Sequence, residues 1–456
     1  MKTTDINLTE GPIGRRLLEF FFPVLFGMLF QMLYNMVDAV IVGKGVGYDA
    51  LAAVGGSAAQ VANLMIGFFN GLATGTTVLV SQYYGARDEG NMRKIVSTSF
   101  LFYAMAGAVL TAVGLLITPW ALRILKNPAD IMDMSVEYLS VYFCGALPLL
   151  LYNMGAGVLR AVGDSRRPLI FLMAGAVTNI LLDCLLVLVL RKGVAGAAWA
   201  TVASEVLSCA LTLGVLMKSR EAYRLDLKSL KLHGNSLKRM LLIGIPAGIQ
   251  SMMYSVSNTL IQSSVNGFGT EVVAAWTAIG KFDNVFWVTS NAFGTALCSF
   301  AGQNYGAGKY DRMRKGMRRC MLYFIIATLV LCPLLLVFGD KAMLLFTDEP
   351  AVIDYAVQML WGFVPFYVIW VFVEMQSSQL RGMGDAVKPT IIVILGVCGI
   401  RIVWLLTVMP RWHTIRNLCY CYPVSWVITA VALFLYLRKS PRMNLQERPE
   451  KSANSH

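Results

Sequence analysis

The chain has 456 residues, of which 57% are hydrophobic and only 14% are charged, and its formal net charge is +13. This composition is too apolar for an ordinary soluble domain and indicates an integral membrane protein. The positive charge is compatible with nucleic-acid binding. Its placement in short loops between apolar runs, however, is typical of the Lys and Arg residues that set the orientation of a membrane protein. We therefore expect no nucleic-acid partner.

Apolar runs long enough to cross about 30 Å of hydrocarbon recur along the whole chain. The runs of the first half are Leu17–Val42, Ala50–Val80, Ile95–Thr118, Met134–Val158, Pro168–Leu190 and Val194–Met217. Those of the second half are Arg239–Val265, Val272–Ala301, Met317–Phe338, Ile353–Leu380, Pro389–Met409 and Leu418–Leu437. They predict an all-α membrane protein with about twelve transmembrane helices.

The basic residues predict which ends of these helices face the cytoplasm. Of the 39 Lys and Arg residues, 29 lie in the N-terminal segment, in the even-numbered loops or after Leu437. Because Lys and Arg in short loops stay on the cytoplasmic side, we expect both termini to be cytoplasmic. The expected organisation is an N-terminal lobe (1–217), a cytoplasmic linker (218–238), a C-terminal lobe (239–437) and a cytoplasmic tail (438–456).

Two motifs occur twice at one spacing. QYYGARDEGNMRK begins at Gln82 and QNYGAGKYDRMRK begins at Gln303, an offset of 221 residues (303 − 82). LRAVGDSRRP at Leu159 and LRGMGDAVKP at Leu380 repeat at the same offset. Since each half has an even number of crossings, the halves are predicted to be parallel repeats, and transporters built this way hold substrate between their repeats.

Acidic residues inside the apolar runs are the main functional candidates, because a carboxylate at the bilayer centre costs about 2.5–3.5 kcal/mol. Asp38, Asp183 and Glu374 are the strongest, whereas Glu205 and Asp283 rank lower. Gln31, Tyr34, Asn35 and Asp38 follow a helical spacing that places them on one face, as do Asn179 with Asp183 and Thr201 with Glu205.

The acids are not repeated in the second half. Asp183 corresponds to Trp404 at the offset of 221, and Asp38 corresponds to Asn258 when Tyr34 is aligned with Tyr254. Two carboxylates with an amide and a hydroxyl suit either a shared proton or a small hard cation. The alternative is that Asp38 and Asp183 only form hydrogen bonds between packed helices.

The chain resembles the multidrug and toxic-compound extrusion (MATE) family, over about residues 13–437. The resemblance rests on YNMVDAVIVG at Tyr34, QYYGA at Gln82, the paired LR-x-x-GD motifs and NILLD at Asn179. It is strongest to the bacterial branch of DinF-like and MepA-like multidrug exporters. The resemblance implies a V-shaped pair of six-helix lobes in the bacterial plasma membrane that exports drugs and other xenobiotics by alternating access, driven by H+ or Na+.

The same resemblance implies a cation-coupling site in the first lobe, formed by Asp38, Asn179, Asp183 and Thr201, and a helix bend at Pro23. In the branch with a strong second-lobe site the seventh helix carries a glutamate, whereas this chain has Tyr254 there. We therefore expect coupling through the first lobe.

Polar, aromatic and methionine side chains on the first, second, seventh, eighth and tenth helices are candidates for the substrate cavity, because aromatic faces suit lipophilic cations and methionine adapts to varied shapes. The candidates are Gln31, Tyr34, Asn35, Met65, Phe68, Phe69, Tyr254, Asn258, Gln262, Trp276, Trp287 and Glu374.

The remaining composition predicts a transporter without a cofactor or resident metal, Na+ at the cation site excepted. Nine cysteines show no zinc spacing or disulfide framework, and three scattered histidines offer little for catalysis. We expect small-molecule substrates, contact with membrane lipid and a functional monomer. Two alternatives stay open: a lipid-linked saccharide flippase of the same wider superfamily, and a polytopic membrane transferase.

Overall fold

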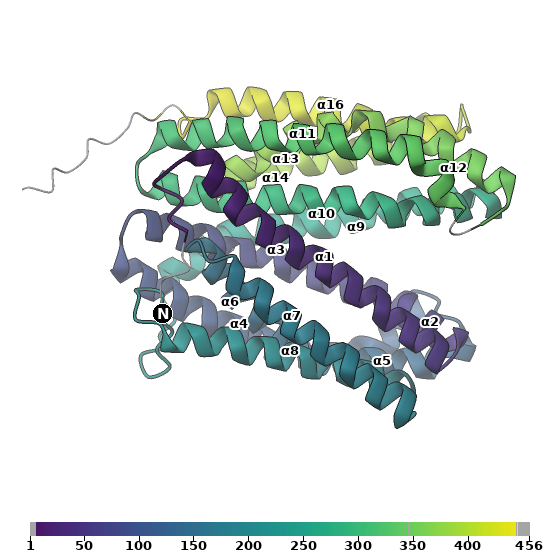
Figure 1. Cartoon of the computed structure of the whole chain (residues 1–456), viewed down its shortest axis with the longest axis horizontal. Helices are drawn as coiled ribbons and strands as arrows, with labels where there is room; N and C mark the ends of the chain where they lie inside the picture. The colour runs from purple at the N-terminus through teal and green to yellow at the C-terminus, as the bar shows by residue number, and fades with distance from the viewer. Residues whose placement is uncertain (1–5, 345–346, 444, 446–456) are drawn as a thin grey trace, which may run out of the picture. The chain divides into compact units, whose positions relative to one another are not determined.

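The computed structural model describes residues 6–344, 347–443 and 445. The described residues form helices and connecting loops without any β-strand, which confirms the predicted all-α class (Figure 1). They divide into two compact units: unit 1 contains Ile6 and residues 22–248, and unit 2 contains residues 7–21 and those from Ile249 onward. The segment predicted as a linker, 218–238, lies in unit 1.

Unit 1 holds most of the first repeat. Its helices are α1 from Phe22 onward (α1 is Ile13–Gly45), α2 (Tyr48–Gly55), α3 (Ser57–Gly85), α4 (Glu89–Ile124), α5 (Met132–Cys144), α6 (Ala146–Ala161), α7 (Arg166–Asp183), α8 (Gly193–Lys218) and the start of α9 (Gly234–Asn266). A 3₁₀ turn at Ala129–Ile131 precedes α5, and α7 continues as a π-helical turn at Cys184–Val189.

Unit 2 holds the start of α1 and most of the second repeat. Its helices are the rest of α9, α10 (Thr270–Gly306), α11 (Tyr310–Met343), α12 (Pro350–Phe363), α13 (Tyr367–Gly382), α14 (Val387–Val393), α15 (Ile400–Thr407) and α16 (Ile415–Lys439). A 3₁₀ turn at Val364–Phe366 joins α12 to α13, and a π-helical turn at Ile394–Gly399 joins α14 to α15.

The described helices are long and apolar enough for a multi-pass membrane protein. Ten pass as candidate membrane spans by length and composition, and an eleventh is added when α5 and α6, bent by 47° at Gly145, count as one span. The remaining long helix, α10, has 37 residues, which is ample to cross the hydrocarbon at about 1.5 Å per residue. Much of α10 is buried within unit 2, so it can carry more polar residues than a lipid-facing helix.

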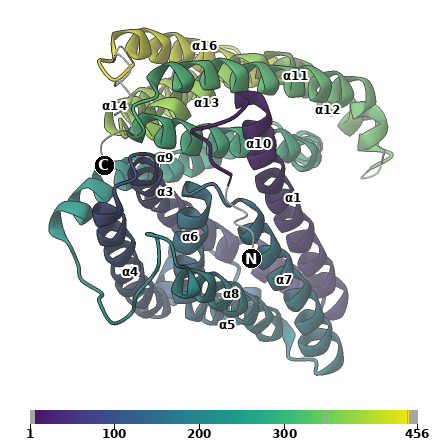
Figure 2. The same cartoon turned by 60° about the vertical axis from the view of Figure 1, so that its left-hand side comes forward.

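The two repeats pack their helices in the same order. In unit 1, α6 contacts α3, α4 and α8, and in unit 2 the corresponding helix α13 contacts α10, α11 and α16. Figure 2 shows α6 beside α8 in the first of these groups. The duplicated sequence is therefore a duplicated packing arrangement.

Glycines bring α3 and the start of α9 into close contact within unit 1. A Cβ on Gly71 would lie 2.5 Å from the Cα of Gly248, and a Cβ on Gly75 would lie 2.3 Å from the carbonyl oxygen of Met240. A Cβ on Gly244 would lie 2.5 Å from the carbonyl oxygen of Leu72. Both helices thus use the small-xxx-small spacing that allows two membrane helices to approach closely.

Residues of the duplicated QxYGA motifs contact the segment before α1 in unit 2 and the first turns of α9 in unit 1. In unit 2, Gln303 accepts a hydrogen bond from the backbone N–H of Leu8 (3.2 Å), and Asn304 donates one to the carbonyl oxygen of Leu8 (3.2 Å). In unit 1, the hydroxyl of Tyr83 accepts a hydrogen bond from Arg239, at 2.8 Å, near the start of α9. Each copy of the motif thus makes a side-chain contact with a segment that is remote in the sequence.

The LR-x-x-GD motifs form tight loops before α7 and α14. Gly163 has φ 101° and Gly384 has φ 77°, conformations that favour glycine. Asp164 accepts a hydrogen bond from the backbone N–H of Arg167 at 3.0 Å and so caps α7. Burial raises the pKa of Asp164, while the backbone N–H of Arg167 acts in the opposite direction. Asp385 instead accepts a hydrogen bond from the hydroxyl of Tyr436 at 2.6 Å.

Candidate functional site

The polar stripe of α1 forms one side of the candidate site in unit 1. The helix is continuous from Ile13 to Gly45, so the spacing of three and four residues places Gln31, Tyr34 and Asp38 along one face. Gln31 and Asn35 are exposed, whereas Tyr34 and Asp38 are half-buried. Asp38 is therefore less exposed than its neighbours Met36 and Val37.

The other side of the site comes from α7 and α8, which pack against each other along much of their length. Asn179 and Asp183 are buried, with 1% and 0% of their surfaces exposed. The amide of Asn179 donates a hydrogen bond to the hydroxyl of Thr201 at 3.5 Å, and Thr201 donates to the carbonyl oxygen of Ala197 at 3.1 Å. The structure thus brings Asn179 and Thr201 together.

Asp183 is the last residue of α7 before the π-helical turn Cys184–Val189. Single π-helical turns interrupt the regular hydrogen bonding of a helix and occur frequently at functional sites. Here the change in helical geometry comes directly after a buried carboxylate in a membrane span.

Asp38 and Asp183 face each other closely enough for their carboxyl groups to interact directly. Neither oxygen of Asp183, nor Oδ1 of Asp38, accepts a hydrogen bond from any described residue. Two carboxylates have no hydrogen between them, so they form a hydrogen bond only when one of them carries a proton. Because like charges repel, it is unfavourable for both carboxyl groups to be ionised at the same time.

No Lys or Arg in the described part of the chain forms an ion pair with either acid. A buried charge without a partner is costly, so the pair requires neutralisation by a proton or by a cation from outside. The available ligands are oxygen atoms of two carboxylates, an amide and a hydroxyl, which suit a hard cation such as Na+. Within the described residues no group of three or more His, Cys, Asp and Glu could hold a metal ion.

The other cavity candidates of unit 1 lie on α3. Met65 packs against a buried apolar cluster that includes Val42 and Ala62. Phe68 and Phe69 meet edge to face, with ring centroids 5.3 Å apart, and Phe68 also lies against Gly248. These three side chains take part in packing, and their contact with substrate stays a prediction.

In unit 2, most of the cavity candidates already have partners within the unit. The hydroxyl of Tyr254 accepts a hydrogen bond from Gln250 at 3.1 Å, and Gln262 donates one to Asn266 at 2.9 Å. Trp287 donates one to Asp283 at 2.7 Å, and Trp276 packs edge-on against Phe363. Asn258 is exposed.

Glu374 forms an ion pair with Arg381 at 2.8 Å and accepts a hydrogen bond from Ser378 at 2.7 Å. The side chain of Glu374 is only 13% exposed, and that of Arg381 is 18% exposed. Gly294 of α10 provides the space, since a Cβ there would lie 2.3 Å from Oε1 of Glu374. The charge of Glu374 is therefore already balanced inside unit 2.

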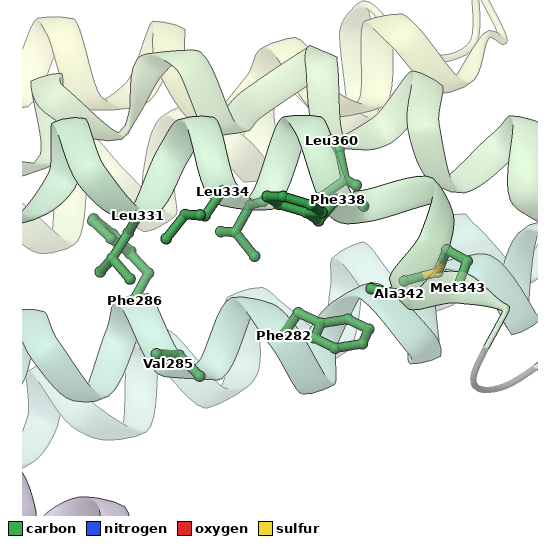
Figure 3. A pocket seen from close by; sticks show the side chains of 11 residues that line it. Phe282, Val285, Phe286, Leu331, Leu334, Phe338, Ala342, Met343 and Leu360 are labelled. Atoms are coloured by element: carbon green, nitrogen blue, oxygen red, sulfur yellow. The ribbon is translucent and has the colours of Figure 1, made fainter.

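Figure 3 shows an apolar pocket of about 220 Å³ inside unit 2, lined by side chains of α10, α11 and α12. Its lining residues are Phe282, Val285, Phe286, Leu331, Leu334, Leu335, Phe338, Gly339, Ala342, Met343 and Leu360. None of the predicted cavity residues is among them. The pocket has no charged side chain, so it offers nothing to balance the charge of a cation.

The sequence interpretation missed two partners of buried acids. Arg381 lies seven residues after Glu374, which is two helical turns and places both side chains on one face. That spacing was a usable signal. The hydroxyl of Tyr367 donates a hydrogen bond to Asp283 from a different helix, and no local pattern in the sequence indicates this contact.

The chain matches a known family over most of its length. The MatE family model matches residues 23–185 and 246–406, more than half of the chain. The probable multidrug resistance protein YoeA of Bacillus subtilis is 28% identical over 401 residues, covering 86% of each chain. The probable multidrug resistance protein YpnP of the same organism is 28% identical over 438 residues, covering 96% of this chain and 97% of the relative.

Solved structures share the fold. A MOP superfamily transporter from Pyrococcus furiosus superposes with a TM-score of 0.90 at 24% identity, covering 97% of this chain and 99% of the other. An outward-facing multidrug resistance MATE transporter superposes with a TM-score of 0.89 at 23% identity over the same shares. The two-lobe, multi-helix architecture predicted from the repeat is thereby confirmed.

Proposed function

The chain belongs to the MatE family of multidrug efflux transporters, which are not enzymes, and from this premise we propose that it is an antiporter coupled to H+ or Na+. The family resemblance drawn from the motifs is thus confirmed, and the transferase alternative is excluded. The exported compounds are proposed to be lipophilic and often cationic. We further propose that it works by alternating access and that residues of unit 1 bind the coupling ion.

The observation that carries the proposal is the pair Asp38 and Asp183 in unit 1. The two carboxyl groups interact, have no basic partner among the described residues, and lie beside the hydrogen-bonded Asn179 and Thr201. A site that must take up a positive charge from outside, in a membrane transporter, supports a role in ion coupling.

Coupling follows if the ion binds the two conformations of the transporter with different affinity. A ligand shifts a conformational equilibrium only by the difference between its affinities for the two states. We propose that a proton or Na+ at Asp38 and Asp183 favours the state that releases substrate outside. Once the ion leaves, the repulsion between the two carboxylates favours the other state.

The substrate class rests on the relatives and on the candidate cavity residues. The relatives include proteins named as multidrug export or resistance proteins, and one named as a FAD transporter from Shewanella oneidensis. Because Arg381 balances the charge of Glu374, we propose that aromatic faces such as Tyr34 and Trp276, rather than this carboxylate, attract lipophilic cations.

The chain is a multi-pass membrane protein, and we propose that it works in the cytoplasmic membrane with both termini inside. A monomer suffices, because each chain contains both repeats. No cofactor is part of the proposal.

The test is uphill export of ethidium from proteoliposomes that contain the purified protein. A proton gradient and a sodium gradient are imposed in separate runs, with protonophore or Na+ ionophore as the matched control. Export against the ethidium gradient under one of them supports antiport and identifies the ion. Failure under both, with folded protein, contradicts the proposal and favours the flippase alternative.

A further inference from the structure

Arg401 carries a positive charge into the interior of unit 2. It lies on α15 inside the candidate membrane span Val387–Thr407, and only 4% of its surface is exposed. Among the described residues, no Asp or Glu forms an ion pair with it. The acids of unit 2 described above, Glu374 and Asp283, are bonded to other side chains. A charge inside a membrane span without a counter-ion is costly, which makes Arg401 a functional candidate.

Two contacts with α16 fix the orientation of the guanidinium group. Its carbon Cζ lies over the ring of Tyr422, 4.1 Å from the ring centroid. Its Nε donates a hydrogen bond to the hydroxyl of Ser425 at 3.4 Å, and this hydroxyl donates one to the carbonyl oxygen of Tyr422 at 2.7 Å. One face and Nε are thus occupied, whereas the edge that carries both Nη nitrogens has no partner among the described residues.

The free edge of the guanidinium group is accessible. Among the described side chains, the fully enclosed polar atoms without a partner include Nε1 of Trp426 but no nitrogen of Arg401. The two Nη nitrogens therefore reach space that water or a ligand can enter. Their N–H groups lie in one plane and match two oxygen atoms of a carboxylate or phosphate, which arginine binds through paired hydrogen bonds.

Aromatic side chains surround the ring on which the guanidinium group lies. The centroid of the Tyr422 ring is 6.3 Å from that of Trp276, 5.9 Å from that of Phe363 and 5.7 Å from that of Trp426. Trp276 and Tyr422 are half-buried, so part of each ring stays accessible. A planar aromatic ligand can pack on such rings, whereas a lipid acyl chain gains no stacking there. These surroundings favour an aromatic anion over a phospholipid.

We propose that Arg401 anchors an oxyanion-binding subsite in the second repeat. Its Nη nitrogens bind the carboxylate or phosphate group of a planar aromatic compound, while Tyr422 and Ser425 hold the guanidinium group in place. At the offset of 221 residues Arg401 corresponds to Ile180, so the subsite has no basic counterpart at that position of the first repeat. The inference goes beyond the export of lipophilic cations proposed above, because it adds aromatic anions to the compounds that the chain binds.

The test measures dye binding to the purified full-length protein in detergent, by fluorescence anisotropy and without an ion gradient. Fluorescein carries a carboxylate on a planar aromatic framework. Rhodamine 6G shares the xanthene ring, but its carboxyl group is an ester and the dye is a cation. Arg401→Gln is expected to weaken fluorescein binding about tenfold or more, the effect of losing a hydrogen bond to a charged group, and to leave rhodamine 6G binding unchanged.

Two further variants complete the comparison. Arg401→Lys keeps the positive charge but loses the planar fork, so it should also weaken fluorescein binding, and it carries the test if Arg401→Gln does not fold. Arg416→Gln removes an exposed positive charge in the first turn of α16. It is the matched control and should bind both dyes as the wild type does.

Three results would overturn the subsite. In the first, the wild type does not bind fluorescein, or Arg401→Gln binds it as tightly as the wild type. In the second, Arg401→Gln weakens both dyes equally, which indicates a structural role. In the third, fluorescein binding in phosphatidylcholine nanodiscs is lost when phosphatidylglycerol is added, which assigns the guanidinium group to a lipid phosphate. None of these results bears on the antiport, because no gradient is used.

Discussion

Glu374 and Arg381 show how a buried carboxylate in a membrane helix can serve structure rather than substrate. Each supplies the charge that the other lacks, and Ser378 donates a hydrogen bond to the carboxylate. Removing one partner of a buried ion pair leaves an uncompensated charge and destabilises by about 3–5 kcal/mol. We therefore predict that Glu374→Gln lowers the melting temperature of the purified protein in detergent.

The double variant Glu374→Gln/Arg381→Met is the matched control for this prediction. It removes both charges, so it should recover most of the lost thermal stability, and it should retain export of cationic dyes. If the double variant loses export of cationic dyes but still exports neutral compounds, Glu374 binds cationic substrates and the structural role is contradicted.

At the same scale, the candidate ion site could be predicted because its residues follow local helical spacing. Asn179 and Asp183 are four residues apart, and Asp38 belongs to a polar stripe within an otherwise apolar run. The direct approach of Asp38 to Asp183 could not be predicted from spacing, because it depends on how α1 packs beside α7. Their coupling role stays a proposal.

Among the elements, the contact of α3 with α9 depends on glycines of both helices. A Cβ on Gly75 would lie 2.3 Å from the carbonyl oxygen of Met240 and 3.0 Å from the nitrogen of Gly244, and backbone cannot move away as a side chain can. Overpacking of this kind costs about 1–3 kcal/mol. We predict that Gly75→Ala reduces thermal stability and the yield of folded protein.

Gly214→Ala on α8 is the control, because a Cβ there meets nothing within 4 Å. Alanine is the better helix former, so this variant should be as stable as the wild type or more so. Equal stability of Gly75→Ala and wild type in thermal unfolding would show that α3 and α9 are not closely packed in solution.

Helix ends and helix breaks were the least predictable features of the elements. The apolar run Leu17–Val42 corresponds to a helix of Ile13–Gly45, because polar turns extend a span beyond the hydrocarbon. The run Met134–Val158 was predicted as one span but breaks at Gly145. The local sequence does contain a cause: Pro148 has no backbone N–H, and its ring clashes with the carbonyl group four residues earlier, that of Cys144, directly before the break.

For the whole molecule, the duplication predicted the repeated packing arrangement, because one offset aligned two separate motifs. The division between units was less predictable. The sequence suggests a break in the linker, whereas α1 and α9 each begin in one unit and continue in the other, at residues 21–22 and 248–249. Each change lies within two residues of a proline, Pro23 in α1 and Pro246 in α9.

The orientation of the whole chain is open to a direct prediction. Since 29 of 39 basic residues lie at the predicted cytoplasmic positions, both termini should be inside the cell. A green fluorescent protein fused after His456 should fluoresce, and alkaline phosphatase fused at the same place should be inactive. The reverse result would invert the proposed direction of transport.

If the acids of the first repeat couple ion movement to export, neutralising them should abolish uphill transport. Asp38→Asn and Asp183→Asn proteins are reconstituted beside the wild type, and ethidium transport is measured with and without the gradient that drives the wild type. We predict that uphill export is lost in both variants while gradient-free exchange continues. Uphill export at the wild-type rate in both variants would contradict the claim.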